Sequence, residues 1–121
     1  MIIADTSVWI DHLRTAEPSL ESLLRREQIL IHPYVIGELA LGSLRNYDAV
    51  IEALLEMPQA AVATPEEVLF TIKRHSLMAS GIGYVDTHIL TAAKLIPGTL
   101  VWTRDKRMAR IAAGLGLRYE P

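Results

Sequence analysis

Residues 1–11 read MIIADTSVWID, and this stretch sets the pattern by which the rest of the chain can be interpreted. Residues 2–4 are apolar and begin with β-branched isoleucines, which is typical of a short buried strand. Asp5 follows this strand directly, and Thr6 or Ser7 can cap the helix that comes next. A carboxylate therefore stands where a buried strand ends and a helix begins.

The same arrangement recurs near the other end of the chain. Residues 99–102 are expected to form a strand, and Asp105 lies just beyond it at the start of a helix. Strands that alternate with helices predict a parallel sheet covered on both faces, and ligands bind such sheets outside the carboxyl ends of the strands. We therefore expect Asp5 and Asp105 at the same functional edge.

Between these two stretches, hydrophobic spacing and the positions of Pro and Gly predict further alternating elements. Additional strands are expected over residues 28–32, 60–63 and 117–119. Helices are expected over residues 6–14, from Pro18, over 33–45, from Asp48 to Pro58, over 65–80, over 84–96 and over 105–113. The chain thus predicts an α/β fold, a three-layer α/β/α domain with a short, mainly parallel central sheet.

The bulk composition fits one globular domain spanning residues 1–121, because 50% of the side chains are hydrophobic and 21% are charged. The absence of cysteine excludes disulfides and thiolate metal sites. Apolar runs fall short of the ~18 residues of a membrane span, and the start lacks the basic region of a signal peptide. We therefore expect a cytoplasmic protein. A net charge of −2 argues against binding nucleic acid by electrostatics alone.

Two further acids stand in apolar surroundings. Glu38 lies among Ile36 and Leu39, near the apolar side of its expected helix, where an unpaired carboxylate is costly. Asp86 lies in the apolar stretch GYVDTHILTAA, without a basic residue four positions later. Asp5 and Asp105 have a simpler alternative role, since each could merely cap a helix.

If the four acids converge, their mutual repulsion requires a compensating cation. Ligation by oxygen alone suits Mg²⁺ or Mn²⁺ rather than Zn²⁺. A divalent ion held by such carboxylates can activate a water molecule and stabilise charge on a phosphodiester. Four carboxylates are compatible with one metal ion or with two.

Four segments resemble the motifs of PIN domains, in the same order and across nearly the whole chain. They are IIADTSVWID, IHPYVIGELALG, GIGYVDTHILTAAK and WTRDKRMARIA. The similarity is greatest to the VapC toxins of bacterial toxin–antitoxin pairs. The resemblance implies a PIN-like fold and an endoribonuclease whose catalytic acids surround Mg²⁺, namely Asp5, Glu38, Asp86 and Asp105. It also implies a homodimer and neutralisation by a cognate antitoxin with a basic C-terminal segment.

Other residues near these acids have two possible roles each. In the family, hydroxyls such as those of Thr6 and Thr103 orient the metal-binding carboxylates, although ordinary capping is the alternative. His88 follows Asp86 by two residues and does not share its helix face, so we expect packing or contact with RNA. Four basic residues that flank Asp105 are expected to contact RNA phosphates or to form a solvated helix face: Arg104, Lys106, Arg107 and Arg110.

Other functions would require different residues in the sequence. A two-component receiver domain needs a phospho-acceptor Asp after a middle strand, and none follows residues 60–63. A haloacid-dehalogenase-like phosphatase needs a second Asp where Ser7 stands. A non-enzymatic, Mg²⁺-binding module remains an alternative, in which the acids hold the basic tail of a partner. A metal-dependent cleavage assay separates that module from an enzyme.

Overall fold

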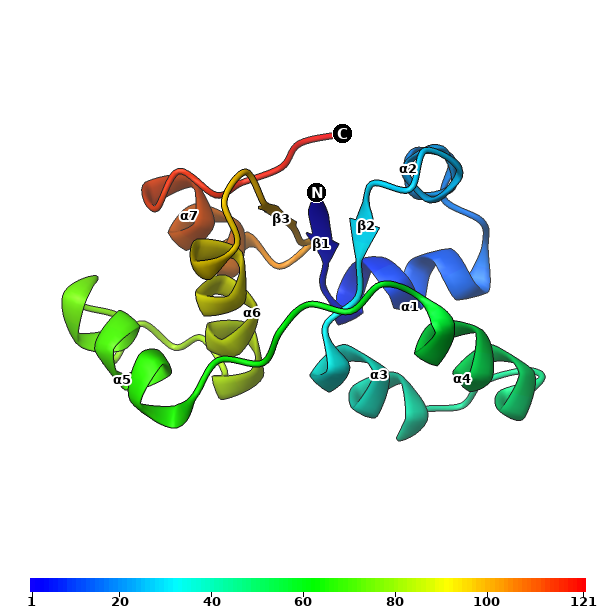
Figure 1. Cartoon of the computed structure of the whole chain (residues 1–121), viewed down its shortest axis with the longest axis horizontal. Coiled ribbons are helices and arrows are strands. Elements are labelled where there is room, and N and C mark those ends of the chain that lie inside the picture. Colours follow the sequence, from blue (N-terminus) through cyan, green and yellow to red (C-terminus); the bar gives the residue numbers. More distant parts are fainter.

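The computed structural model describes residues 1–121 and is built around a three-stranded sheet (Figure 1). The strands are parallel and lie in the order β2-β1-β3, with bounds β1 (Ile2–Ala4), β2 (Ile29–Leu30) and β3 (Leu100–Trp102). Ile3 of the central strand pairs with Leu30 on one side and with Val101 on the other. The predicted α/β fold with a short parallel sheet is confirmed.

Two of the expected strands, over residues 60–63 and 117–119, do not form, and only a single parallel bridge lies at or next to each. Beside β2, Gln59 bridges Ile31, and the N–H of Ala60 donates to the Ile31 carbonyl at 2.9 Å. The alanine-rich residues 60–63 then leave the sheet, because alanine adds little of the side-chain packing that stabilises a strand. Beside β3, the expected strand 117–119 makes only the bridge between Arg118 and Val101.

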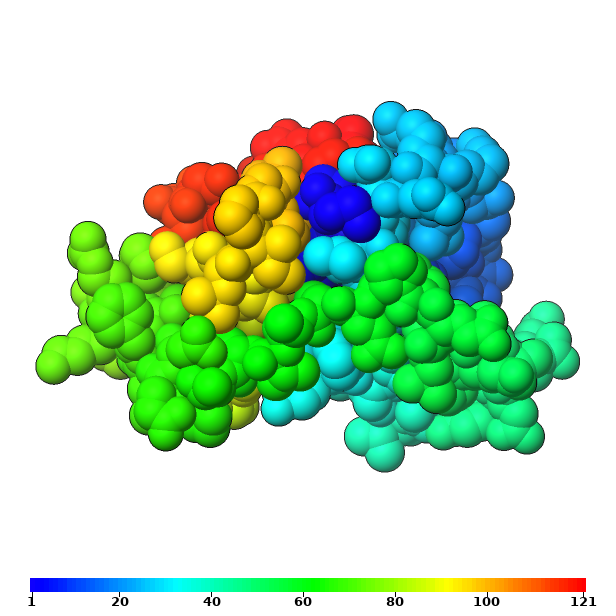
Figure 2. Space-filling model, viewed as in Figure 1, coloured from blue at the N-terminus to red at the C-terminus, as the bar shows by residue number.

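Helices surround the sheet. Their bounds are α1 (Thr6–Arg14), α2 (Pro18–Arg25), α3 (Pro33–Ala40), α4 (Tyr47–Glu56), α5 (Pro65–Arg74), α6 (Tyr84–Leu95) and α7 (Lys106–Gly114). In Figure 1 the strands stand between α1 and α2 on one side and α6 and α7 on the other. In the space-filling view, little of the dark-blue N-terminal segment is visible between its neighbours (Figure 2). No helix combines the length and the apolar character that crossing a membrane requires.

Two helices end earlier than predicted. Helix α5 stops at Arg74 rather than at residue 80, because Ser76 adopts a left-handed backbone with φ of 53°. The N–H of Leu77 then donates to the Ile72 carbonyl at 2.9 Å, which satisfies the end of the helix in a Schellman-type turn. Helix α3 stops at Ala40 rather than at residue 45, and a turn leads into α4.

The core fixes the position of the sheet edge at which β1 and β3 end. Ile3, Val101 and Leu90 are fully buried, so the strands and α6 are locked against one another by apolar packing. The backbone N–H of Asp5 donates to the Trp102 carbonyl at 2.9 Å, directly after the last β1–β3 pair. The residues that follow β1 and β3 therefore emerge side by side.

Candidate active site

Asp5 lies at the centre of the polar residues on this edge. It caps α1, and its Oδ1 accepts hydrogen bonds from the Val8 N–H at 3.2 Å and from Ser7 Oγ at 2.5 Å. Its Oδ2 accepts a short hydrogen bond from Thr103 Oγ1. Only 4% of Asp5 is exposed, and this burial raises its pKa above the ordinary value, although the hydrogen bonds oppose the change.

Asp105 joins Asp5 through a shared threonine. Asp105 is exposed and caps α7, where its Oδ1 accepts a hydrogen bond from the Met108 N–H at 2.8 Å. Thr103 Oγ1 accepts the backbone N–H of Asp105 at 3.0 Å while donating its own proton to Asp5. Thr103 thus links the ends of β1 and β3 and fixes one carboxylate relative to the other.

Glu38 reaches the same region from α3. The expectation that it lies on the apolar side of its helix was wrong, because Val35, Ile36 and Leu39 are buried whereas Glu38 is exposed. Exposure removes the desolvation cost that the sequence had suggested. Glu38 Oε1 accepts a hydrogen bond from Thr6 Oγ1 at 2.6 Å, which ties α3 to the start of α1.

Asp86 completes the group from the first turn of α6 and is half-buried. Its pKa is raised from 3.8 to about 6. Burial is the largest cause, a backbone hydrogen bond from Gly83 opposes it, and the remaining increase comes from repulsion by the other carboxylates, Asp5, Asp105 and Glu38. Each of the other three acids therefore lies close enough to influence the charge of Asp86.

The chemistry of this donor set suits a hard divalent cation. No three of the His, Asp or Glu side chains are arranged closely enough to hold an ion by themselves. Mg²⁺ does not require such a cage, because it usually keeps several waters and binds through one or two carboxylates together with substrate phosphates. A cation would also relieve the repulsion that raises the pKa of Asp86. The residues present therefore fit a hydrated Mg²⁺ or Mn²⁺.

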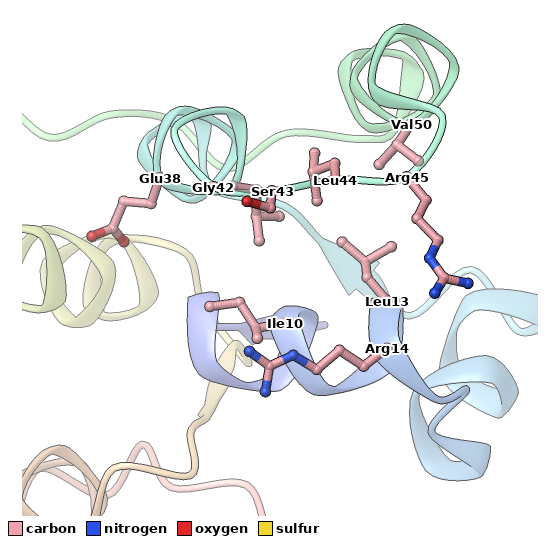
Figure 3. A pocket seen from close by; sticks show the side chains of 10 residues that line it. Ile10, Leu13, Arg14, Glu38, Gly42, Ser43, Leu44, Arg45 and Val50 are labelled. Carbon is pink, nitrogen blue, oxygen red and sulfur yellow. The ribbon is translucent and has the colours of Figure 1, made fainter.

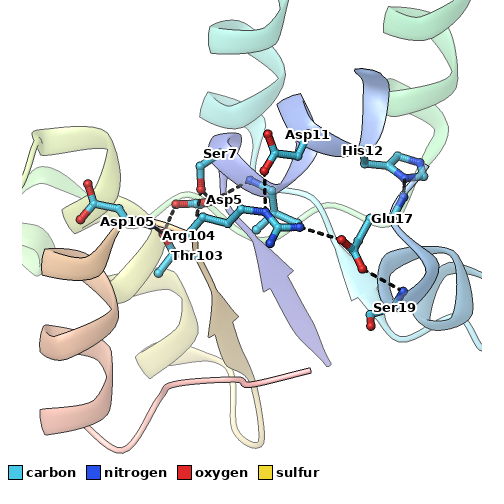
Figure 4. A network of polar contacts seen from close by, with 10 residues as sticks. Asp5, Ser7, Asp11, His12, Glu17, Ser19, Thr103, Arg104 and Asp105 are labelled. Carbon is cyan, nitrogen blue, oxygen red and sulfur yellow. Dashed lines mark hydrogen bonds and ion pairs between the residues drawn. The ribbon is translucent and has the colours of Figure 1, made fainter. Parts of the chain in front are cut away.

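Arg104 uses its guanidinium within the protein (Figure 4). Its Nε lies 2.7 Å from Asp11 Oδ2 and its Nη2 lies 2.7 Å from Glu17 Oε2. Its backbone N–H donates to Ser7 Oγ at 3.1 Å, on the side of the loop that faces Asp5. These contacts fasten the loop after β3 to α1 and to the start of α2, and the predicted contact of Arg104 with phosphate gains no support from them.

The other basic residues divide into two kinds. Arg107 also points back into the protein, where its Nη1 donates to the Gly81 carbonyl at 3.1 Å. Gly81 has a φ of 87°, a left-handed backbone conformation that favours glycine, and a Cβ there would also displace the Arg107 guanidinium, whose Nη1 would lie 2.5 Å away. Lys106 and Arg110 are exposed on α7 and form no salt bridge or side-chain hydrogen bond. Only these two remain available to an anionic ligand.

Sequence reasoning missed a buried aromatic cluster beside the acids. His32 is fully buried and caps α3, where its Nδ1 accepts a hydrogen bond from the Tyr34 N–H at 3.0 Å. His88 is 3% exposed and contacts the rings of Tyr34 and Tyr84. A histidine directly before a helix-starting proline, as in His32-Pro33, was the signal for the cap.

A groove of about 530 Å³ begins at Glu38 and runs between α1, α3 and α4 (Figure 3). Its walls combine apolar and basic side chains: Ile10, Leu13, Arg14, Glu38, Leu39, Gly42, Ser43, Leu44, Arg45 and Val50. Because Glu38 belongs both to the groove and to the group of acids, a ligand lying in the groove can reach that group.

The raised pKa of Asp86 makes the stability of the metal-free protein depend on pH. Unfolded Asp86 ionises near pH 3.8, whereas the folded protein retains the proton up to about pH 6. The stability that the protonated Asp86 contributes to the folded protein is therefore present below pH 3.8 and is lost as the pH rises through about 6. In chelator, the melting temperature of Asp86→Asn should therefore rise relative to that of the wild type as the pH increases from 3.8 to about 6. A difference between the two proteins that does not vary with pH would contradict the placement of Asp86.

Comparison with known proteins agrees with this geometry. Residues 2–114 match the PIN domain family. Two curated relatives are 44% identical over 117 residues, which covers 97% of this chain and 94% of theirs. Both are Ribonuclease VapC32, from the CDC 1551 / Oshkosh and ATCC 25618 / H37Rv strains of Mycobacterium tuberculosis. The chain therefore belongs to the PIN-domain family and is a relative of the VapC ribonucleases.

Proposed function

We propose that this protein is a Mg²⁺-dependent endoribonuclease that hydrolyses RNA phosphodiester bonds and acts as the toxin of a toxin–antitoxin pair. The observation that carries the proposal is the grouping of four carboxylates at one sheet edge, where repulsion by Asp5, Asp105 and Glu38 adds to burial in raising the pKa of Asp86. Its relatives are named ribonucleases of the VapC type. A toxin that cuts cellular RNA acts where that RNA is, so we expect it in the cytoplasm.

Asp5 and Asp86 would hold the metal, with Glu38 and Asp105 binding it or its waters. When bound, Mg²⁺ or Mn²⁺ would activate a water molecule and stabilise charge on the phosphodiester. Thr103 keeps the Asp5 carboxylate in a fixed orientation, and Thr6 does the same for Glu38. The Thr103 hydroxyl donates to an Asp5 oxygen, which favours the ionised form that binds a cation.

RNA would approach past α7, where Lys106 and Arg110 are free to contact phosphates. Arg104 and Arg107 instead hold the loops that carry the active-site residues. This division explains how a chain with a net charge of −2 can still present positive charge where the substrate lies.

The antitoxin would occupy the groove that begins at Glu38. Ile10, Leu13 and Val50 give this groove an apolar wall suited to an amphipathic helix. A basic residue in the antitoxin tail would then enter the group of acids and take the place of the metal's positive charge. We also expect a homodimer, for which Leu69 and Phe70 of α5 offer exposed apolar surface, 62% and 67% exposed. Light scattering of the free protein would measure its oligomeric state.

Loss of a metal-binding carboxylate should abolish activity. RNA cleavage should require Mg²⁺ or Mn²⁺ and stop in chelator. Asp5→Asn and Asp86→Asn should each lower the cleavage rate at least ~100-fold, the scale on which electrostatic stabilisers act. Asp48→Asn is the matched control, because Asp48 is exposed on α4. Cleavage at the wild-type rate by both active-site variants would leave the non-enzymatic, partner-binding alternative.

Replacing the free basic residues should change how binding depends on salt. Lys106→Ala and Arg110→Ala should each flatten the slope of log K against log salt by about 0.7 for single-stranded RNA, the effect of one lost phosphate contact. Arg25→Ala, at an exposed position on α2, is the control. Slopes that match the control for both variants would assign these residues to an ordinary solvated surface.

A charge placed in the groove should prevent neutralisation. We expect the neighbouring gene to encode a small antitoxin whose co-expression restores growth. Leu13→Asp should block that rescue, because a carboxylate would be buried against the apolar face of the antitoxin helix. Leu55→Asp, on α4 but outside the groove, should leave rescue intact. Rescue of the Leu13 variant as complete as that of the wild type would exclude the groove as the antitoxin site.

A further inference from the structure

Two exposed tyrosines flank a buried histidine beside the acids. The ring centroids of Tyr34 and Tyr84 each lie 4.7 Å from that of His88, with interplanar angles of 67° and 89°. His88 is only 3% exposed, whereas Tyr34 is 38% and Tyr84 is 54% exposed. Each tyrosine therefore forms a T-shaped pair with a buried imidazole while much of its own surface faces solvent.

A second buried histidine, His32, packs behind the Tyr34 and His88 rings. His32 is fully buried behind them, with its ring centroid 5.0 Å from that of Tyr34 and 6.2 Å from that of His88. Its Nδ1 accepts the Tyr34 backbone N–H, which fixes the first turn of α3. A ring held in place before a ligand arrives loses little conformational entropy on binding. The buried imidazoles thus make the two exposed rings a preorganised surface.

This surface adjoins the acids along α3. Tyr34 and Glu38 are four residues apart on α3 and so lie on the same face of the helix. Tyr84 begins α6 two residues before Asp86 and packs against His88 four residues later, so it lies on the His88 face of that helix. Tyr84 adjoins the acids through Tyr34, because both rings contact His88. A chain that passes Glu38 along α3 therefore meets Tyr34 and, beside it, Tyr84.

We infer that Tyr34 and Tyr84 form a stacking surface for an unpaired nucleobase of the RNA, next to the bond that the acids cut. The inference rests on the proposed function and names the substrate as single-stranded at that point. Proteins hold unpaired bases by stacking them on aromatic side chains, and such stacking tolerates any base. Affinity from stacking also suits a chain of net charge −2 in which Arg104 and Arg107 are already engaged.

The test measures binding of a fluorescently labelled, mixed-sequence single-stranded RNA by anisotropy, in an Asp5→Asn background that prevents cleavage. Tyr34→Leu and Tyr84→Leu remove the ring but keep apolar bulk, and the Phe variants at both positions keep the ring. Each Leu variant should weaken Kd by about 5-fold or more, the scale of a lost base–aromatic stack. The Phe variants should retain the parental Kd. The salt slope should not change, because no ionic contact is lost.

Matched measurements separate this inference from the function on which it rests. With Asp5 intact, the Leu variants should keep the Mn²⁺-dependent melting shift of the wild type, which shows that the acids are undisturbed. Unchanged Kd in both Leu variants, while the wild type still cleaves RNA, would overturn the inference alone. If the Leu variants change the oligomeric state but leave Kd unchanged, the inference is also overturned, and the tyrosines would instead belong to a contact with another protein chain. Failure of the wild type to bind or cut RNA would overturn the proposed function and the inference together.

Discussion

Repulsion among four carboxylates at the carboxyl edge of a small parallel sheet is the constraint on which this structure depends. Asp5 and Asp105 cap α1 and α7, and Asp86 lies in the first turn of α6. Three of the four acids therefore stand at helix N-termini, where the helix dipole stabilises negative charge. Even so, the pKa of Asp86 is raised to about 6, first by burial and then by repulsion from the other three acids, so the dipoles and hydrogen bonds only partly offset these effects. A divalent cation is the simplest means of offsetting the rest.

The basic residues near the acids keep the group in place without neutralising it. Arg104 is paired with Asp11 and Glu17, and the pKa of Glu17 lies below its ordinary value because the Ser19 N–H and the Arg104 guanidinium favour the ionised carboxylate. Arg107 fastens the turn at Gly81, just before α6. Each guanidinium thus holds a loop that delivers an acid, while the carboxylates themselves remain free to bind a cation.

Much of the fold could be predicted from the local sequence pattern, and each expectation that was wrong has an identifiable physical cause. Strand β1 and the helix directly after it are encoded in adjacent residues, so both could be predicted, although the helix is capped by Asp5 and not by Thr6 or Ser7 as expected. The end of α5 could not, because Ser76 adopts the left-handed backbone that a reader of sequence expects of glycine. Residues 117–119 have strand-like character but obtain a single bridge to β3, and only the completed sheet reveals this.

The candidate site shows the same division between local and long-range information. The four acids could be selected from their positions after strands and within apolar helices, and by resemblance to PIN domains. The exposure of Glu38 and the pairing of Arg104 with Asp11 depend on how α1, α3 and the loop after β3 pack, which no local spacing encodes. The same holds for the contact between Tyr34 and His88, which joins two helices distant in sequence.

The most direct measurement of the central claim is a crystal structure of the protein soaked in Mn²⁺, with an anomalous difference map recorded for the metal. The account predicts an anomalous peak among Asp5, Glu38, Asp86 and Asp105, with water completing an octahedral shell. The side chains of Asp5 and Asp86 should lie nearest to the peak. A peak at another position, or no peak at a Mn²⁺ concentration that supports RNA cleavage, would contradict it.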